Sequence, residues 1–210
     1  MITSLLRRRA AVVFLSLAAA LVPAAATEAA PAAPAVRAAP AAPAAAVLKP
    51  GDCPVVNDRL FAAADPVDIG RITPRPAWRN DCRQLYRADG RGPQTIFEEG
   101  FQARDITYGQ YDLQEYVLVN QPSPYVSTTY DHDLYKRWKA AFNYYVDAPG
   151  GVDVNKTIGD THKYADQVEV AFPGGVDRTF IVGACPIDQA TKTEIMSGCV
   201  DNPHYRPWRS

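Results

Sequence analysis

The sequence lacks the short motifs that mark several common enzyme classes. It has no G-x-G-x-x-G or P-loop spacing, which argues against a Rossmann fold and against a nucleoside-triphosphate site. It has no G-x-S-x-G elbow to support Ser-His-Asp hydrolysis. Asp131-His132-Asp133 has the composition of a metal cluster, but acids at the start of a helix complement the helix dipole. We therefore expect no metal.

The chain also lacks an excess of positive charge. Its 22 Lys and Arg residues face 23 Asp and Glu residues, for a net charge of -1. Without the first 26 residues, which hold three arginines and no acid, 19 basic residues face 23 acidic ones. Sequence-independent DNA binding depends on Lys and Arg neutralising phosphates. The composition is therefore a poor fit to a DNA-coating protein, and any contact with DNA is expected to be weak, local and salt-sensitive.

Long apolar runs are confined to the N-terminal region. Arg7, Arg8 and Arg9 precede an apolar run over 10–22, and three alanines follow at 24–26, which is the order found in secretory signal peptides. Roughly 13 apolar residues are fewer than the ~20 that cross a bilayer comfortably. We predict a signal peptide, rather than an uncleaved anchor, and a secreted protein without a membrane span.

The chain divides into three regions, of which the first is the predicted signal peptide, residues 1–26. Residues 27–48 include 12 alanines and four prolines, so no helix there could run far before a proline interrupts it. This composition predicts a semi-extended export linker. Residues 49–210 are numerous enough to bury a sizeable core, and we expect them to form one catalytic or binding domain that is monomeric.

Cysteine is scarce, and none of the four cysteines stands in a C-x-x-C pair of the kind that zinc sites favour. Export favours disulfides instead. Three pairings are possible. The local one, Cys53 with Cys82 and Cys185 with Cys199, needs the least threading and is the one we predict. Two free catalytic thiols are the functional alternative.

The pattern of the domain predicts an α+β fold, with no repeat of 20 to 50 residues. Short strands near the end and helices earlier favour a sheet-on-sheet core with helices packed on one side. The predicted helices are 59–64, 93–100 and 131–139, and the predicted extended segments are 84–87, 115–120, 124–129, 141–146, 167–172 and 178–184.

Three separated segments carry the chemistry. Arg87 leaves a strand just before a Gly-containing turn and a helix. Ser127 begins a Ser-Thr-Thr run at the end of a second strand. Gln167 and Glu169 lie two residues apart, so strand alternation predicts that both side chains point to the same face.

Arginine, hydroxyl and carboxylate in this order resemble the R-S-E class of mono-ADP-ribosyltransferases, which includes the cholera- and pertussis-type toxins. The resemblance covers roughly 84–202 and includes the stretch 93–101. A narrower likeness, to the pierisin- and scabin-like branch, rests on 135–155, on Tyr164 and on 202–205. It implies the ADP-ribosyltransferase fold, with two packed β-sheets forming a split core and flanking helices. It also implies a secreted enzyme that modifies guanine in DNA or in guanine nucleosides and nucleotides.

The resemblance implies that NAD⁺ is the donor substrate rather than a recycled cofactor. Glu169 would hold the 2′-hydroxyl of the nicotinamide ribose and stabilise an oxocarbenium-like transition state. Ser127 would orient that carboxylate, and Arg87 would bind the diphosphate or the adjoining ribose. Asp89 is placed with the NAD⁺-binding group, although a structural turn role is the stronger interpretation. The alternatives are a solvated strand glutamate, an ordinary strand edge and a surface ion pair of Arg87 with a neighbouring acid.

The acceptor side is implied by four further residues. Gln167 would accept a hydrogen bond from N2 of guanine and present that amine to the ribose. Trp138 and Tyr164 would stack on a base, the alternative being ordinary core packing. Asn120 would touch the base. Three rival functions remain open: transfer to protein arginine, hydrolysis of NAD⁺, and an inactive module that binds NAD⁺ or a partner.

Overall fold

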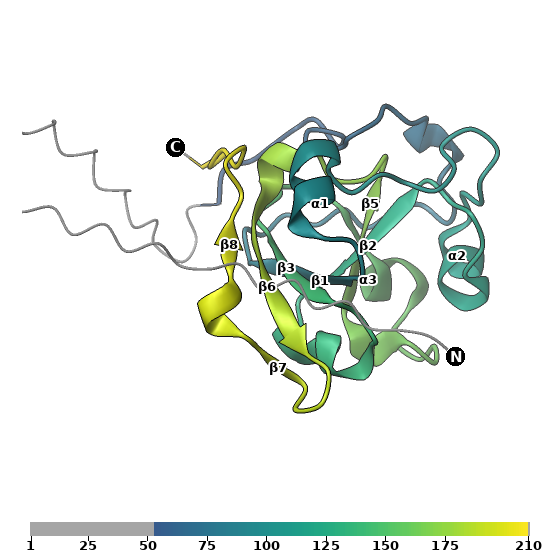
Figure 1. The fold of residues 1–210 in the computed structure, drawn as a ribbon. Helices are drawn as coiled ribbons and strands as arrows, with labels where there is room; N and C mark the ends of the chain where they lie inside the picture. Colours follow the sequence, from purple (N-terminus) through teal and green to yellow (C-terminus); the bar gives the residue numbers. More distant parts are fainter. Residues whose placement is uncertain (1–52, 210) are drawn as a thin grey trace, which may run out of the picture. The chain divides into compact units, whose positions relative to one another are not determined.

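The computed structural model describes residues 53–209 (Figure 1). The predicted signal peptide and linker, and the first residues of the predicted domain, lie outside the described residues. Within 53–209, no helix has the length and apolarity that a membrane crossing requires.

Antiparallel strands form the body of the domain, in the order β4-β5-β2-β1-β3-β6-β7, with β8 paired to β6. Their bounds are β1 Leu85–Asp89, β2 Tyr125–Thr129, β3 Phe142–Val146, β4 Val152–Asp153, β5 Glu169–Pro173, β6 Ile181–Asp188, β7 Thr193–Glu194 and β8 Val200–Asp201. The helices are α1 Pro93–Glu99, α2 Leu113–Val119 and α3 Val154–Ile158, and short 3-10 helices are η1 Ile69–Arg71, η2 His132–Arg137, η3 Ala165–Gln167, η4 Arg178–Phe180 and η5 Met196–Gly198.

The path of strands is split near its middle. β1 and β2 meet through the single registered pair Tyr86 and Thr129, whereas β1 pairs with β3, and β2 with β5, along their lengths. Strands from both halves nevertheless contribute to one core cluster, so the halves pack around shared apolar side chains. The predicted α+β class with a split core and flanking helices is confirmed.

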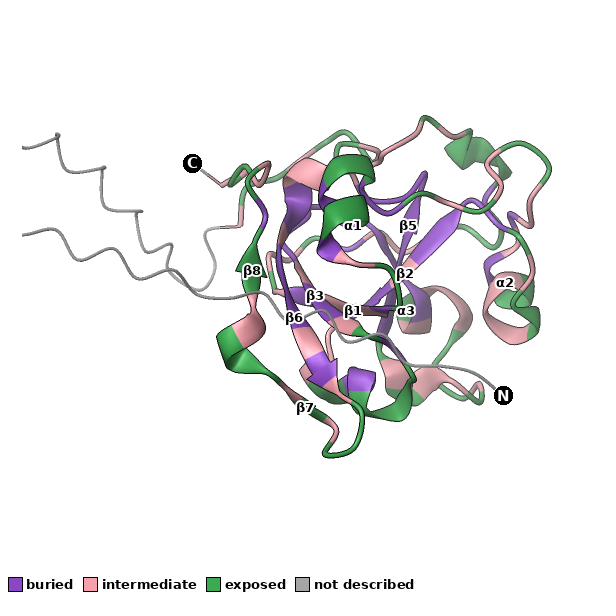
Figure 2. Cartoon of the chain, viewed as in Figure 1, coloured by how far each residue is buried: buried purple, intermediate pink, exposed green. Residues whose placement is uncertain are grey.

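Strand alternation decides which side chains enter that core. Along β5, Val170 and Phe172 join the cluster that includes Ile96 and Phe97 of α1, while Ala171 joins a second cluster on the opposite face. Figure 2 shows β5 and its neighbours mostly buried and the outer side of α1 exposed. The burial of apolar surface stabilises the packing of these layers, and each Å² removed from water contributes about 25 cal/mol.

The helix α1 begins and ends as its sequence predicts. Pro93 occupies its first turn, where the missing N–H costs nothing, and Gly100 follows its last residue with a φ of 73°. A side chain at Gly100 would also meet the carbonyl oxygen of Val176 at 2.6 Å. Glycine is therefore required at this position both for its backbone angle and for the close approach of the next segment.

The second cluster packs α2 and α3 on the other face of β2 and β5. It contains Ile72, Tyr111, Leu113, Tyr125, Val152, Val154 and Ala171. The prediction that 115–120 is extended is wrong, because this region forms α2. Asp112 caps the helix by accepting from the N–H of Glu115 at 2.9 Å, and Asn120 ends it in the left-handed conformation. Capping and packing outweigh the strand preference of its valines.

Other predicted elements also differ from the structure. Residues 59–64 form a turn rather than a helix. The helix predicted over 131–139 is the shorter 3-10 helix η2. The strand predicted over 167–172 begins only at Glu169, and β6 begins only after η4. In η2 and η4, an Asp at the N-cap accepts from a backbone N–H two residues later, which favours a tight turn.

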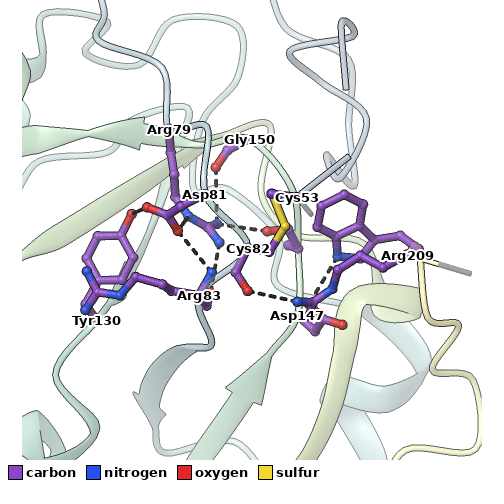
Figure 3. The surroundings of a disulfide bond; sticks show 11 residues. Cys53, Arg79, Asp81, Cys82, Arg83, Tyr130, Asp147, Gly150 and Arg209 are labelled. Atoms are coloured by element: carbon purple, nitrogen blue, oxygen red, sulfur yellow. Dashed lines mark hydrogen bonds and ion pairs between the residues drawn. A yellow bond between two sulfur atoms is a disulfide. The ribbon is translucent and has the colours of Figure 1, made fainter. Parts of the chain in front are cut away.

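Two disulfides cross-link the described part of the chain, one near its N-terminal end and one between β6 and the segment before β8. Cys53 is bonded to Cys82, and Cys185 of β6 is bonded to Cys199. Figure 3 shows that the first bridge lies beside Arg209, the last residue that the structure describes; Arg209 donates to the carbonyl of Cys82 at 3.0 Å and contacts Asp147. The N- and C-terminal segments of the described chain are therefore held at the same place.

These bridges predict a measurable mass. Protein purified without reductant should weigh about 4 Da less than the fully reduced chain, because each disulfide removes two hydrogens. Opening the second bridge by Cys185→Ser and Cys199→Ser together should cost about 3 kcal/mol of unfolding free energy, since its ends are 14 residues apart. Intact-mass spectrometry and urea unfolding measure both effects. Titration of four reactive thiols in the native protein would contradict the pairing.

Candidate active site

The carboxylate of Glu169 lies buried at the start of β5. Glu169 is 8% exposed and pairs in register with Thr129 of β2. The hydroxyl of Tyr116 on α2 donates to Oε1 of Glu169 at 2.9 Å. Burial raises the pKa of Glu169, while hydrogen bonding by Ser127 and Tyr116 and the charge of Arg87 oppose that rise. Burial outweighs these neighbours, so the pKa of Glu169 lies above its ordinary value, and the neighbours limit that rise.

Arg87 bridges the split between β1 and β2. Its Nη1 donates to the carbonyl of Ser127 at 2.8 Å, and its Nε and Nη2 donate to Oδ2 of Asp89 at 3.2 and 3.1 Å. The guanidinium also lies 5.2 Å from the ring centre of Phe101. These contacts fix the planar group in one orientation at the edge of the site.

Asp89 serves two arginines at once. Besides Arg87, it binds Arg91, whose Nε and Nη2 donate at 3.0 and 2.8 Å. Asp89 lines neither of the two pockets described below, so it stands behind the arginines. Burial alone would raise the pKa of Asp89, but the hydrogen bonds and charges of the two arginines lower it to about 2.

The lowered pKa predicts how stability depends on pH. An ionised Asp89 stabilises the fold above pH 4, and this contribution is lost as the pH falls through about 2. Asp89→Asn should therefore cost about 2 kcal/mol at pH 7, and the difference from the wild type should shrink between pH 4 and pH 2. Urea unfolding over this range measures it. A difference that stays constant with pH would show that the arginine pairing is not its source.

A pocket of about 320 Å³ opens beside Glu169. It brings together seven of the residues singled out in the sequence, namely Arg87, Asn120, Ser127, Trp138, Tyr164, Gln167 and Glu169. They come from β1, the end of α2, β2, the segments around η2 and η3, and β5. Side chains far apart in the sequence therefore share one cavity.

A second pocket of about 430 Å³ adjoins the first, since the two share Arg87, Tyr116, Asn120 and Ser127. Its walls add Arg91 and Arg104, so three arginines surround it. Guanidinium groups bind phosphate oxygens with two parallel hydrogen bonds. The pair of pockets suits an elongated ligand with an anionic portion over the arginines and a reactive portion at Glu169.

Gln167 does not lie on the strand. It ends η3, and Val168 after it adopts the left-handed conformation with a φ of 40° before β5 begins at Glu169. The prediction from strand alternation is therefore wrong about the backbone. Gln167 nevertheless lines the pocket, and within residues 53–209 no hydrogen bond is recorded to its side-chain amide. A β-branched residue with positive φ is unusual, and such backbone is found preferentially at functional sites.

The remaining predicted residues form the outer wall. Trp138 is 48% exposed at the pocket rim, which excludes ordinary core packing. Tyr164 is half-buried, and Nζ of Lys163 lies 4.7 Å from its ring centre. Asn120 ends α2 rather than a strand, and its Oδ1 accepts from Arg104 at 3.0 Å.

Sequence reasoning missed Tyr116, Arg91 and Arg104. Tyr116 stands four residues before Asn120, so a helix prediction for this region would have placed both on one face. Because 115–120 is predicted as an extended segment, the sequence pattern does not place Tyr116 and Asn120 on a common face. Arg91 and Arg104 reach the second pocket from separate loops, and no local pattern brings them together.

The Asp131-His132-Asp133 run has a structural role. Asp131 caps η2 by accepting from the N–H of Asp133 at 2.9 Å. Nε2 of His132 lies 3.2 Å from the carboxylate of Glu194 and 3.1 Å from the hydroxyl of Tyr145. Within residues 53–209, no three His, Cys, Asp or Glu side chains are grouped so as to hold a metal ion.

Comparison with protein families and curated proteins gives consistent matches. A family model described as Scabin-like matches residues 85–205. A guanine-specific ADP-ribosyl transferase of Streptomyces coelicolor is 70% identical over 158 residues, which cover 74% of this chain and 78% of that protein. Pierisin of Pieris brassicae is 38% identical over 120 residues, which cover 50% of this chain but only 14% of Pierisin.

Solved structures give the same result. The Scabin toxin of Streptomyces scabies in complex with NADH superposes with a TM-score of 0.74 at 66% identity, covering 74% of this chain and 96% of that one. The solved structure of a guanine-specific ADP-ribosyltransferase superposes with the same TM-score at 70% identity, covering 74% of this chain and 99% of that one.

Proposed function

The chain belongs to the Scabin-like family and has the ADP-ribosyltransferase fold, and from this premise we propose that it transfers ADP-ribose from NAD⁺ to guanine. The resemblance to the pierisin- and scabin-like branch is confirmed by the similarity to Scabin and Pierisin. The acceptor is guanine in DNA or in a guanine nucleoside or nucleotide, as the name of the 70% identical relative supports.

One observation carries the proposal: the buried carboxylate of Glu169 and the fixed guanidinium of Arg87 flank two adjoining pockets. These residues fit NAD⁺. The pocket at Glu169 suits the nicotinamide ribose, and the one that adds Arg91 and Arg104 suits the diphosphate. A relative at 66% identity binds NADH, which supports this fit.

When bound, NAD⁺ supplies a cationic N-glycosidic bond that breaks through an oxocarbenium-like transition state. Glu169 accepts from the ribose 2′-hydroxyl, and its preorganised charge stabilises the positive charge that develops on the sugar. Ser127 orients the carboxylate, and Arg87 binds the diphosphate or the adjoining ribose. Asp89 holds Arg87 and Arg91 in place and has no direct contact with the substrate. No step needs a metal bound by these residues.

The acceptor enters past the outer wall of the first pocket. Gln167 accepts from the exocyclic amine of guanine, and its uncommitted amide is available for this bond. Trp138 and Tyr164 offer ring surfaces on which a base can stack, at about 1–3 kcal/mol each. Asn120 contacts the base from the end of α2. All four side chains line the pocket that contains Glu169.

Contact with DNA should be weak. Near Trp138, Lys136 pairs with Asp133 at 2.5 Å, and Arg137 pairs with Asp166 at 2.5 Å, so these cations are largely neutralised. The affinity for DNA should therefore be low, because few phosphates are neutralised by the remaining charge.

Residues 1–26 act as a signal peptide in this proposal, 27–48 as an export linker and 49–210 as the catalytic domain. Secretion agrees with the two disulfides, which persist in oxidising compartments. One chain carries every residue that this proposal assigns to the two pockets, so a monomer suffices for the activity.

The test is mass spectrometry after incubating the purified protein with NAD⁺ and, separately, deoxyguanosine, double-stranded DNA and a protein lysate. The expected result is a mass gain of one ADP-ribose on guanine together with released nicotinamide. Modification of protein arginine alone would assign the other acceptor class. Nicotinamide release with no modified acceptor would indicate hydrolysis, and no nicotinamide release would indicate an inactive module.

A further inference from the structure

Tyr116 makes the one side-chain contact of α2 with the carboxylate of Glu169 that the structure records within residues 53–209. The helix places this hydroxyl firmly. Asp112 caps α2 and also accepts from the hydroxyl of Thr73 at 3.0 Å, and the ring of Tyr116 packs against Tyr125 with ring centres 4.8 Å apart. The phenol therefore reaches Glu169 from a helix that is fixed at its start and along its face.

We propose that Tyr116 is a positioning residue for the transfer reaction. Its hydroxyl holds Oε1 of Glu169, which keeps the carboxylate ionised and leaves Oε2 for the ribose hydroxyl of NAD⁺. The inference rests on the proposed function. It adds a hydrogen-bond donor that does not belong to the arginine, serine and glutamate motif. This donor lies on α2, which the sequence pattern predicts as an extended segment.

The direction of the hydrogen bond follows from the environment. Burial, together with the negative charge of Glu169, raises the pKa of Tyr116 well above its ordinary value, so the phenol stays protonated and donates. A donor to a carboxylate stabilises the charged form, and this opposes the effect of burial on Glu169. Removing the hydroxyl should therefore raise the pKa of Glu169 further.

Other groups that face Glu169 act in known directions. Arg87 from β1 adds positive charge, and Ser127 from β2 adds a hydroxyl, and both lower the pKa of Glu169. The titratable side chains elsewhere in the same pocket are Tyr86, Asp131, Tyr135 and Tyr164. Tyr116→Phe leaves all of these side chains in place, so a change in titration reports the lost phenol.

Tyr116→Phe should lower turnover about 10-fold, because a hydrogen bond to a charged group is lost. The KM for NAD⁺ should stay within a few-fold. The acid limb of the kcat profile should move to higher pH by about one unit, since the carboxylate has lost a donor. An unchanged acid limb would overturn the proposal, because a merely structural role would lower activity without moving it.

Tyr111→Phe is the matched control. Tyr111 is buried in the cluster on which Tyr116 packs, and its hydroxyl donates to the carbonyl of Ile106 at 2.6 Å rather than to Glu169. This variant also deletes one phenol oxygen near α2, so it reports the general cost of that deletion. Its acid limb should coincide with that of the wild type.

A second measurement is independent of catalysis. Carbon-13 NMR titration of the carboxyl of Glu169 in the ligand-free protein should show a higher pKa in Tyr116→Phe. Placing 3-fluorotyrosine at position 116 should lower it, because a more acidic phenol donates more strongly. Equal pKa values in all three proteins would overturn the inference. If the wild type releases no nicotinamide from NAD⁺, the proposed function fails while this titration still decides the role of Tyr116.

Discussion

Glu169→Ala should lower the turnover of NAD⁺ by at least ~10²-fold and leave the affinity for NAD⁺ within a few-fold. The carboxylate meets a charge that is fully developed only in the transition state, so its loss affects kcat rather than binding. Arg87 and the other arginines keep the contacts that bind the substrate. Steady-state measurement of nicotinamide release, with calorimetric titration of NAD⁺, separates the two quantities.

The matched variant is Glu169→Gln, which keeps the volume and an acceptor for the Tyr116 hydroxyl but removes the charge. Because the folded state raises the pKa of Glu169, stability falls as the pH rises through that pKa. Glu169→Gln should therefore be inactive yet have a higher Tm than the wild type at neutral pH, with the gain shrinking in acid. Near-normal turnover in either variant would remove Glu169 from the mechanism.

Local patterns in the sequence predict the parts of the fold that local physics determines. The strand containing Arg87, the strand containing Ser127 and the helix between Pro93 and Gly100 are all present. Each has a signal within a few residues, either apolar alternation or a Pro and Gly at the helix ends. The chemical order of arginine, hydroxyl and carboxylate could also be read along the chain.

Predictions failed where contacts distant in the sequence decide the conformation. Tyr and Val residues favour strands, yet the segment after Asp112 is helical because a cap starts it and the second core cluster packs on it. Strand alternation predicts a strand position for Gln167, but the left-handed backbone at Val168 turns the chain just before β5. This turn directs the Gln167 side chain toward the pocket by a route that strand alternation does not describe.

The arginines of the second pocket show a further limit of the sequence. Arg87 could be recognised because it belongs to a motif, whereas Arg91 and Arg104 were two among many surface cations. Their role becomes visible only in the structure, where both side chains line the same pocket. Asp89 binds Arg91, and Asn120 binds Arg104, so acid and amide neighbours direct both guanidinium groups to one cavity.

Gln167→Ala should lower transfer to guanine by at least ~10²-fold, while hydrolysis of NAD⁺ should stay within a few-fold of the wild type. Water needs no orientation by an amide once the sugar cation has begun to form, whereas the guanine amine does. Since the Gln167 side chain has no recorded hydrogen bond within residues 53–209, truncating it should leave the fold intact. Parallel assays of modified deoxyguanosine and of free ADP-ribose measure both reactions, and equal losses in the two would contradict the role of Gln167.

Inosine provides a stricter test, because it changes the acceptor and leaves the protein untouched. Its base lacks the N2 amine, so the wild-type enzyme should modify guanosine and leave inosine unmodified under the same conditions. Both bases should stack equally on Trp138 and Tyr164, which makes inosine a control for base binding. If inosine were modified as well as guanosine, N2 could not be the nucleophile. The hydrogen bond assigned to Gln167 would then be wrong, while the roles of Glu169 and Arg87 in breaking NAD⁺ would stand.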